Sequence, residues 1–193
     1  MNYTQYRKVA KTGDCILFSG KGKTSAGIMW ATWSKWSHVG MIICDRIYDH
    51  VLVWESTTLS NLIDIDTDSY VKGVQVVPLS LRLSTYISDV GVRPLTSALE
   101  TDQIGSLMRL RKTFTGRPYE ENFLELICSA YDGPGGENTE DLQSLFCSEL
   151  VAEAYQRIGF LDEEKPSNEY TPADFAEDPV FERFLKKVEV IER

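Results

Sequence analysis

The stretch LFCSELVAEAYQRIG, from Leu145 to Gly159, carries the clearest structural signal in the chain. Its apolar side chains fall at i, i+3, i+4, i+7, i+8 and i+11, which is the spacing of one continuous stripe along an α-helix. The sequence therefore predicts a helix over Leu145–Ile158, capped by Ser144 and ended by Gly159 in a left-handed conformation. The stripe consists of Cys147, Leu150, Val151, Ala154, Tyr155 and Ile158.

Cys147 lies in the first turn of this predicted helix, on the face that meets the core. There the helix dipole and free backbone N–H groups favour a thiolate, and the same N–H groups can hold an oxyanion. A free thiol has a pKa of about 8.5 and needs such help to act as a nucleophile. The alternative is that Cys147 only packs in the core, since free cysteines are often buried.

Short apolar runs in the first half of the chain predict strands, and helical spacing prevails in the second half. Ser97 and Glu100 have capping-box spacing before an amphipathic segment that ends at Gly116 and Pro118. The expected fold class is α+β, with an antiparallel sheet packed against helices in a single domain over residues 1–193. The predicted strands are Asp14–Phe18, Ser37–Cys44, Val51–Glu55, Gly73–Leu79 and, as a fifth candidate, Gly91–Leu95. Later in the chain, the candidates are a helix over Glu121–Tyr131, a loop over Asp132–Asp141 and a helix or closing strand over Phe181–Ile191.

His38 and Glu55 lie in two consecutive predicted strands, SHVGMIIC and VLVWES. A hairpin turn centred between Arg46 and Ile47 would place His38 directly opposite Glu55 on one face of the sheet, so that the carboxylate orients the imidazole. A one-residue slip would send Glu55 to the other face. Each residue also has a plainer interpretation, His38 as a strand histidine bound to a backbone carbonyl and Glu55 as a surface charge. His50, beside the turn, is expected to be exposed and not catalytic.

Composition narrows the function classes. The 193 residues carry a net charge of −9 and no Lys/Arg cluster of the kind that follows phosphates, so nucleic acid is not an expected partner. Four cysteines without a CxxC pair and two histidines give no zinc-ligand spacing, and no metal or cofactor is expected. No signal peptide and no membrane span are expected, which favours a cytoplasmic location.

Six segments in order resemble the circularly permuted papain-like cysteine hydrolases of the NlpC superfamily, whose relatives include lecithin:retinol acyltransferase-like proteins. The resemblance implies a permuted papain-like fold with the nucleophile at a helix N-terminus, and it implies Cys147, His38 and Glu55 as the catalytic residues. Tyr119 matches a recurrent tyrosine position of the family, which implies either a residue that lines the substrate site or a buried aromatic with a satisfied hydroxyl. The next residue is Glu120, where the family often has Asp. The segments are GDCILF (13–18), SHVGM (37–41), WES (54–56), GRPYEENF (116–123), FCSEL (146–150) and TPADF (171–175).

Three functions follow from this resemblance. The first is a hydrolase that cleaves an amide, isopeptide or γ-glutamyl-type bond in a small peptide or amide substrate through a thioester. The second is a lipid thioesterase or acyltransferase on the same residues, with Trp30, Trp33 and Trp36 as an apolar wall for the acyl chain or, alternatively, as core residues. Glu55 favours the first, since the lecithin:retinol acyltransferase relatives have a histidine there. The third is a non-catalytic binding module of the same fold.

Overall fold

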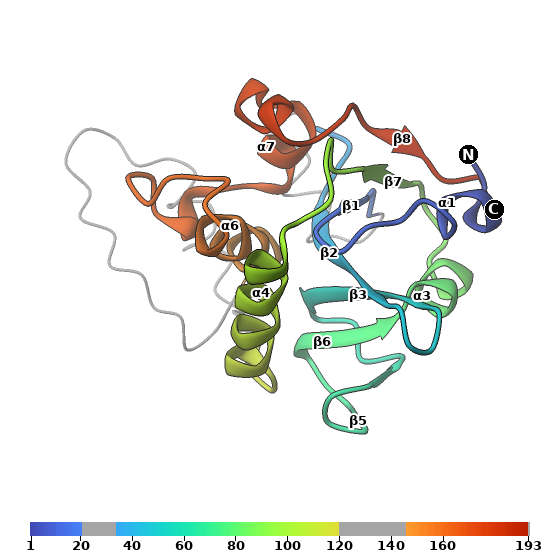
Figure 1. The fold of residues 1–193 in the computed structure, drawn as a ribbon. Helices are drawn as coiled ribbons and strands as arrows, with labels where there is room; N and C mark the ends of the chain where they lie inside the picture. The colour runs from blue at the N-terminus through green and yellow to red at the C-terminus, as the bar shows by residue number, and fades with distance from the viewer. Residues whose placement is uncertain (21–33, 120–145, 193) are drawn as a thin grey trace.

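The structure, a computed structural model, describes residues 1–20, 34–119 and 146–192 (Figure 1). Several expectations therefore lie outside the described residues. These are Trp30 and Trp33, the helix over Glu121–Tyr131, the loop over Asp132–Asp141 and the Ser144 cap.

A six-stranded sheet forms the centre of the fold, in the order β6-β3-β2-β1-β7-β8. Every neighbouring pair in it is antiparallel. All five predicted strand runs are strands of this sheet, which confirms the α+β class. The strands are β1 (Cys15–Phe18), β2 (His38–Asp45), β3 (His50–Thr57), β6 (Gly73–Pro78), β7 (Val90–Arg93) and β8 (Glu189–Val190); a separate two-stranded hairpin holds β4 (Ile63–Asp64) and β5 (Ser69–Tyr70).

Helices cover both faces of the sheet (Figure 1). On one face, here called the α6 face, lie α4 (Thr101–Phe114), α6 (Cys147–Arg157) and α7 (Pro172–Glu177), together with the 3-10 turns η1 (Ser167–Glu169) and η2 (Pro179–Arg183). On the other, here called the α3 face, lie α1 (Tyr3–Tyr6) and α3 (Leu79–Thr85).

Alternation along the strands separates two buried clusters, because successive side chains of a strand point to opposite faces. The larger cluster, on the α6 face, includes Met41 and Trp54 from the sheet and Tyr155 from α6. The smaller cluster, on the α3 face, includes Phe18 and Val53 from the sheet. Trp36 is 4% exposed and belongs to the larger cluster, so this tryptophan is a core residue.

The hairpin between β2 and β3 differs from the predicted register. Met41 pairs with Trp54 and Asp45 with His50, so the turn is centred between Ile47 and Tyr48, one residue later than predicted. The side chain of Asp45 accepts hydrogen bonds from the N–H groups of Ile47 and Tyr48, at 2.9 and 3.2 Å. Asp49 then adopts a left-handed conformation with φ of 54°, which closes the longer turn.

Helix α4 begins later than its predicted capping box. Glu100, not Ser97, occupies the N-cap position, and the Glu100 N–H donates to Gln103 Oε1 at 3.0 Å. Tertiary hydrogen bonds hold the preceding chain extended, since Leu95 N–H donates to Asp14 Oδ1 and Thr96 N–H to the Phe184 carbonyl. The predicted end is confirmed: the helix ends at Phe114, and Gly116 has a φ of +77°.

The C-terminal segment, predicted to form a helix or a closing strand, forms a short 3-10 turn and a strand. Residues Pro179–Arg183 form a 3-10 turn, and Glu189–Val190 pairs with β7 as the edge strand of the sheet. Within the described residues, no helix is long and apolar enough to cross a bilayer.

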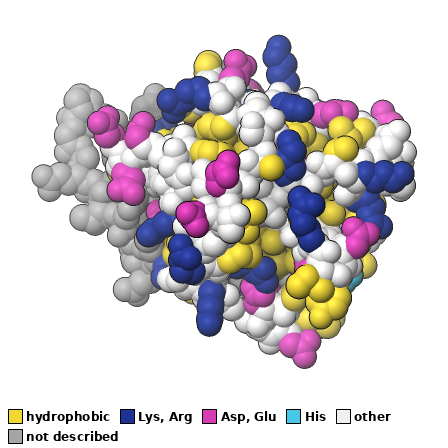
Figure 2. Space-filling view, in the orientation of Figure 1, with side chains coloured by type: hydrophobic (Ala, Val, Ile, Leu, Met, Phe, Trp, Pro, Cys, Tyr) yellow, Lys and Arg dark blue, Asp and Glu magenta, His cyan; other side chains and the backbone are white. Residues whose placement is uncertain are grey.

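The surface in the orientation of Figure 1 mixes both signs of charge with scattered apolar side chains (Figure 2). A group of hydrophobic side chains lies at the lower right of this view. The β4–β5 hairpin exposes apolar side chains as well. The exposed apolar residues of this hairpin are Ile63, Ile65 and Tyr70, exposed by 48, 47 and 64%.

Candidate active site

His38 and Glu55 form a buried pair on the α3 face. His38 Nε2 lies 2.6 Å from Glu55 Oε2, and the side chains are 15% and 1% exposed. A carboxylate withdrawn from water in this way needs hydrogen-bonding or charged partners. Because an ionised Glu55 only accepts hydrogen bonds, the imidazole carries its proton on Nε2 and leaves Nδ1 as the basic nitrogen.

The two residues meet diagonally across the ladder. The observed register places Glu55 beside Gly40, two residues along β2 from His38, and the even shift keeps both side chains on one face. A Cβ atom at Gly40 would lie 3.3 Å from Glu55 Cβ and 3.1 Å from the Trp54 carbonyl oxygen. The glycine makes room for the side chain of Glu55 on its path to His38.

Two further side chains contact Glu55, and sequence reasoning missed both. Arg82 Nη2, from α3, lies 2.5 Å from Glu55 Oε1, and Arg82 is 1% exposed. Gln75, directly opposite Glu55 on β6, donates from Nε2 to the same oxygen at 3.4 Å. One signal could have found Arg82. It shares a helical face with Leu79 and Leu83, where an arginine without a buried partner would not be expected.

The electrostatics of the pair follow from these contacts. Burial alone would raise the pKa of Glu55, but Arg82 and then His38 outweigh it, and the pKa is lowered. Burial alone would lower the pKa of His38, but Cys147 and then Glu55 reverse the shift and raise the pKa to about 9. Glu55 is therefore ionised over the neutral range, and the site favours an imidazolium at position 38.

Cys147 is the first residue of α6 and forms a side-chain hydrogen bond with His38. Since His38 Nε2 is bound to Glu55, Nδ1 is the ring nitrogen that remains for the Cys147 thiol. Both His38 and Cys147 are the first residues of their elements, so the contact forms where the end of a strand meets the end of a helix. The three residues thus lie in one chain of contacts, from Cys147 through His38 to Glu55.

Helix α6 is packed more completely than its apolar stripe predicts. The whole stripe from Cys147 to Ile158 is buried, and so is every other residue up to Gln156. Gly159 follows with a φ of +75°, as the predicted left-handed helix end. This burial anchors the helix that carries the thiol.

Tyr119 lies near the start of α6. Its ring packs perpendicular to that of Phe146, the residue before Cys147, with the ring centroids 5.9 Å apart. This contact places Tyr119 at the end of the helix that carries the thiol. The role of Tyr119 in binding substrate stays a prediction. His50 is exposed, on the face of β3 opposite to Glu55.

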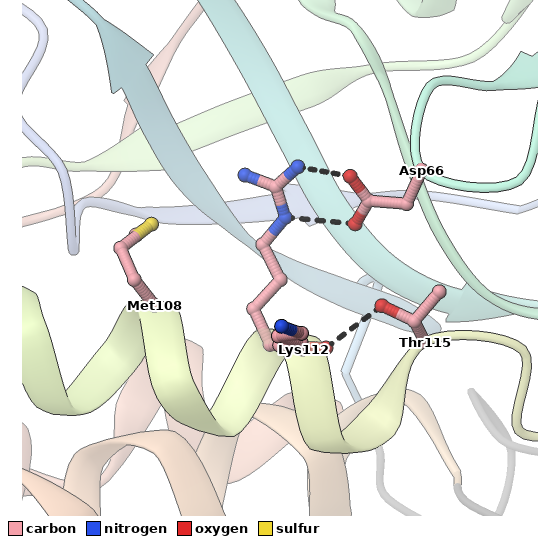
Figure 3. A pocket seen from close by; sticks show the side chains of 5 residues that line it. Asp66, Met108, Lys112 and Thr115 are labelled. Atoms are coloured by element: carbon pink, nitrogen blue, oxygen red, sulfur yellow. Dashed lines mark hydrogen bonds and ion pairs between the residues drawn. The ribbon is translucent and has the colours of Figure 1, made fainter.

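Other features of the described residues do not resemble a catalytic centre. No group of three or more His, Cys, Asp or Glu side chains among them is arranged to hold a metal ion. A hollow of about 530 Å³ lies beside α4 and is lined by Asp66, Met108, Arg111, Lys112 and Thr115 (Figure 3). The guanidinium of Arg111 binds the Asp66 carboxylate with two nitrogens, and neither His38 nor Cys147 lines this hollow.

Comparisons with known proteins bear on the family and the fold of this chain. No curated protein matches the chain. Among solved structures, the metalloprotein YiiX of Escherichia coli O157:H7 superposes with a TM-score of 0.56 over 79% of this chain and 68% of that chain, at 22% sequence identity, which supports the fold. The model of the permuted papain-like amidase family C92, which is named after YaeF and YiiX, matches residues 9–171. The chain therefore belongs to the permuted papain-like amidases of the C92 family and is a cysteine hydrolase of the amidase or peptidase type.

Proposed function

We propose that this enzyme cleaves an amide bond with Cys147 as nucleophile, His38 as general base and Glu55 as the residue that orients the imidazole. The observation that carries the proposal is the position of His38, which contacts Glu55 with Nε2 at 2.6 Å and hydrogen-bonds the Cys147 thiol on its other side. A nucleophile, a base and an orienting group in contact are the pattern of a catalytic triad.

The reaction follows from the chemistry of these groups. His38 Nδ1 takes the thiol proton, and the sulfur of Cys147 attacks the amide carbon. Backbone N–H groups in the first turn of α6 stabilise the oxyanion, because such groups lack intrahelical acceptors. The carbon–nitrogen bond breaks, the imidazolium gives its proton to the leaving amine, and a thioester remains. Water then attacks the thioester with His38 as base, which releases the carboxylic acid and the free thiol.

The pH dependence of Cys147 alkylation by iodoacetamide tests this proposal. In the wild type, Cys147 is expected to react well below pH 7, whereas in His38→Ala its reactivity rises only near pH 8.5, the range of a free thiol. At pH 6 the rate constant should fall by about 100-fold or more, the usual contribution of a positioned base. Peptide mass spectrometry resolves the individual cysteines.

Cys44 is an internal control in every sample, because burial raises its pKa to about 11. Cys15 is a second control, since burial raises its pKa further. Both thiols should stay unlabelled while the protein is folded. Equal labelling of Cys147 and Cys44 at pH 6 would count against the proposal and favour the non-catalytic binding module.

The scissile bond is the finer part of the proposal. An amide, isopeptide or γ-glutamyl-type bond in a small peptide is favoured over a lipid ester, because Trp36, one of the tryptophans considered for an acyl-chain wall, packs in the core. Turnover of amide but not acyl-ester substrates, without binding to liposomes, is the expected result. A reducing, cytoplasmic location fits the three free thiols among the described residues, Cys15, Cys44 and Cys147.

A further inference from the structure

The two oxygens of the Glu55 carboxylate have different partners. Oε2 contacts His38 at 2.6 Å, whereas Oε1 contacts Arg82 at 2.5 Å and Gln75 at 3.4 Å. Rotation of the carboxylate would break a fully buried ion pair, so the contacts on Oε1 determine the direction in which Oε2 points.

Arg82 is itself held in place by the fold. Its Nη1 donates to Asn61 Oδ1 at 3.0 Å, and its neighbours Leu79 and Leu83 anchor α3 in the smaller core cluster. Within the described residues, Glu55 is the only acidic group that forms an ion pair with this arginine. A buried guanidinium with a single carboxylate partner places strong constraints on that carboxylate.

We propose that Arg82 is a positioning residue of the active site, which keeps Glu55 ionised and directed at His38. This inference rests on the proposed function, since it assigns a role through the triad. It adds a fourth member to the chain of contacts, which then runs from Arg82 through Glu55 and His38 to Cys147.

The physical reason lies in the competition between burial and charge at Glu55. Without Arg82, burial dominates and the pKa of Glu55 rises. A protonated Glu55 no longer stabilises a protonated imidazole, so His38 would accept the thiol proton less readily and the Cys147 thiolate would form only at higher pH. The pH below which Cys147 loses its reactivity, here called the acid limit, should therefore move upward when Arg82 is removed.

The groups that face Glu55 come from three elements. His38 belongs to β2, Gln75 to β6 and Arg82 to α3, and Cys147 lies beyond His38 on α6. Among the described residues, Tyr86 at the end of α3 is the remaining titratable neighbour. Burial and then the charge of Glu55 raise its pKa to about 12, so it stays neutral over the range of interest. The acid limit therefore reports on Glu55 and its two charged partners.

Arg82→Met and Arg82→Lys test the proposal through the pH profile of Cys147 alkylation. In Arg82→Met the acid limit should shift upward by about one pH unit or more, the usual effect of removing an opposite charge in contact. Arg82→Lys, which keeps the charge but not the geometry, should shift it by less. An acid limit that matches the wild type in Arg82→Met would overturn the proposal.

Arg93→Met is the matched control. Arg93 is 2% exposed, but it binds the backbone carbonyls of Lys186 and Phe175 and not Glu55. Removing it should lower stability without moving the acid limit of the folded fraction. A shift of equal size in this control would show that the effect of Arg82 is only structural, and it would also overturn the proposal.

The ¹⁵N resonances of the His38 ring separate this inference from the proposed function. They report the tautomer and the titration midpoint of His38 whether or not Cys147 is a nucleophile. A lower titration midpoint of His38 in Arg82→Met supports the role of Arg82. This holds even if His38→Ala leaves the reactivity of Cys147 unchanged, because unchanged reactivity in His38→Ala would refute only the triad.

If Arg82→Met does not fold, Asn61→Ala replaces it, because Asn61 is exposed and anchors only Nη1 of Arg82. A smaller shift in the same direction is then expected, and no shift counts against the proposal.

Discussion

Among the described residues, each face of the sheet buries one arginine, and the two are bound in different ways. On the α6 face, Arg93 donates to two backbone carbonyls at 2.8 and 2.7 Å and ties the C-terminal segments to the sheet. On the α3 face, Arg82 is bound to a carboxylate that also contacts His38. Backbone carbonyls do not titrate, whereas a carboxylate does. One arginine therefore joins segments of the fold, and the other acts on the charge state of the candidate active site.

The packing around the two arginines also differs between the faces. On the α6 face, Phe175, Phe181 and Tyr155 form part of an aromatic cluster, with the rings of Phe175 and Phe181 4.7 Å apart. On the α3 face, a smaller apolar cluster surrounds the charged pair of Glu55 and Arg82. We expect the packing on the α6 face to affect stability alone, and the ion pair on the α3 face to affect both stability and reactivity.

The largest expected effect comes from breaking the ion pair on one side. Glu55→Met leaves Arg82 buried without its partner and should cost about 3–5 kcal/mol of unfolding free energy. The double variant Glu55→Met/Arg82→Met should recover most of this loss, because apolar residues of similar volume can replace a buried pair. Urea denaturation measures both.

Reactivity should not recover in the same double variant. Cys147 alkylation at pH 6 is expected to stay low in the single and the double variant, since neither has a carboxylate beside His38. Recovery of stability without recovery of reactivity would separate the two roles of the pair. A double variant that is both stable and reactive would show that the pair is not needed at the site.

Phe175→Ala should give the next largest effect, confined to stability. Phe175 is fully buried, and its truncation is expected to cost about 3 kcal/mol through lost burial and the cavity left behind. Tyr70→Ala, at a tyrosine that is 64% exposed, is the control and should stay near the wild type in urea denaturation. The pH profile of Cys147 in the folded fraction should be unchanged, and a displaced profile would contradict the separation of the two faces.

A smaller effect is expected in acid. The pKa of Glu55 is lower in the folded state than the ordinary value of 4.5, so its charge contributes stability above pH 4.5. This contribution is lost as the pH falls through the lower folded value. The urea midpoint of the wild type should therefore fall more steeply below pH 4.5 than that of Glu55→Met/Arg82→Met. Parallel acid profiles would mean that the pair is not ionised in the folded protein.

The smallest effect is expected at the second histidine. His50 is exposed beside the hairpin turn, so His50→Ala should change the unfolding free energy by less than about 0.5 kcal/mol. Cys147 alkylation should follow the wild-type pH profile. A marked loss of reactivity would point to His50 as a competing base.

Local patterns were sufficient to predict the elements that carry the site. The run around His38, the run before Glu55 and the stripe that begins at Cys147 each form the predicted strand or helix. Apolar periodicity within a few residues is a local property, and it survives folding because one face of each element must be buried. The shared face of His38 and Glu55 was also predictable, although the turn lies one residue later, because this shift moves the register by two residues and keeps the face.

Contacts between distant segments were decided only by the tertiary structure. Tertiary hydrogen bonds to residues 95 and 96 moved the start of α4, and the packing of α3 brought Arg82 to Glu55. Neither of these has a periodic signature, since each depends on how separate elements close on one another. The sequence by itself determined the strands, the helix of Cys147 and the order of the reactive residues. The partner of the buried carboxylate was decided by the fold, because the cost of burying a charge is met by whichever opposite charge the packing brings into contact.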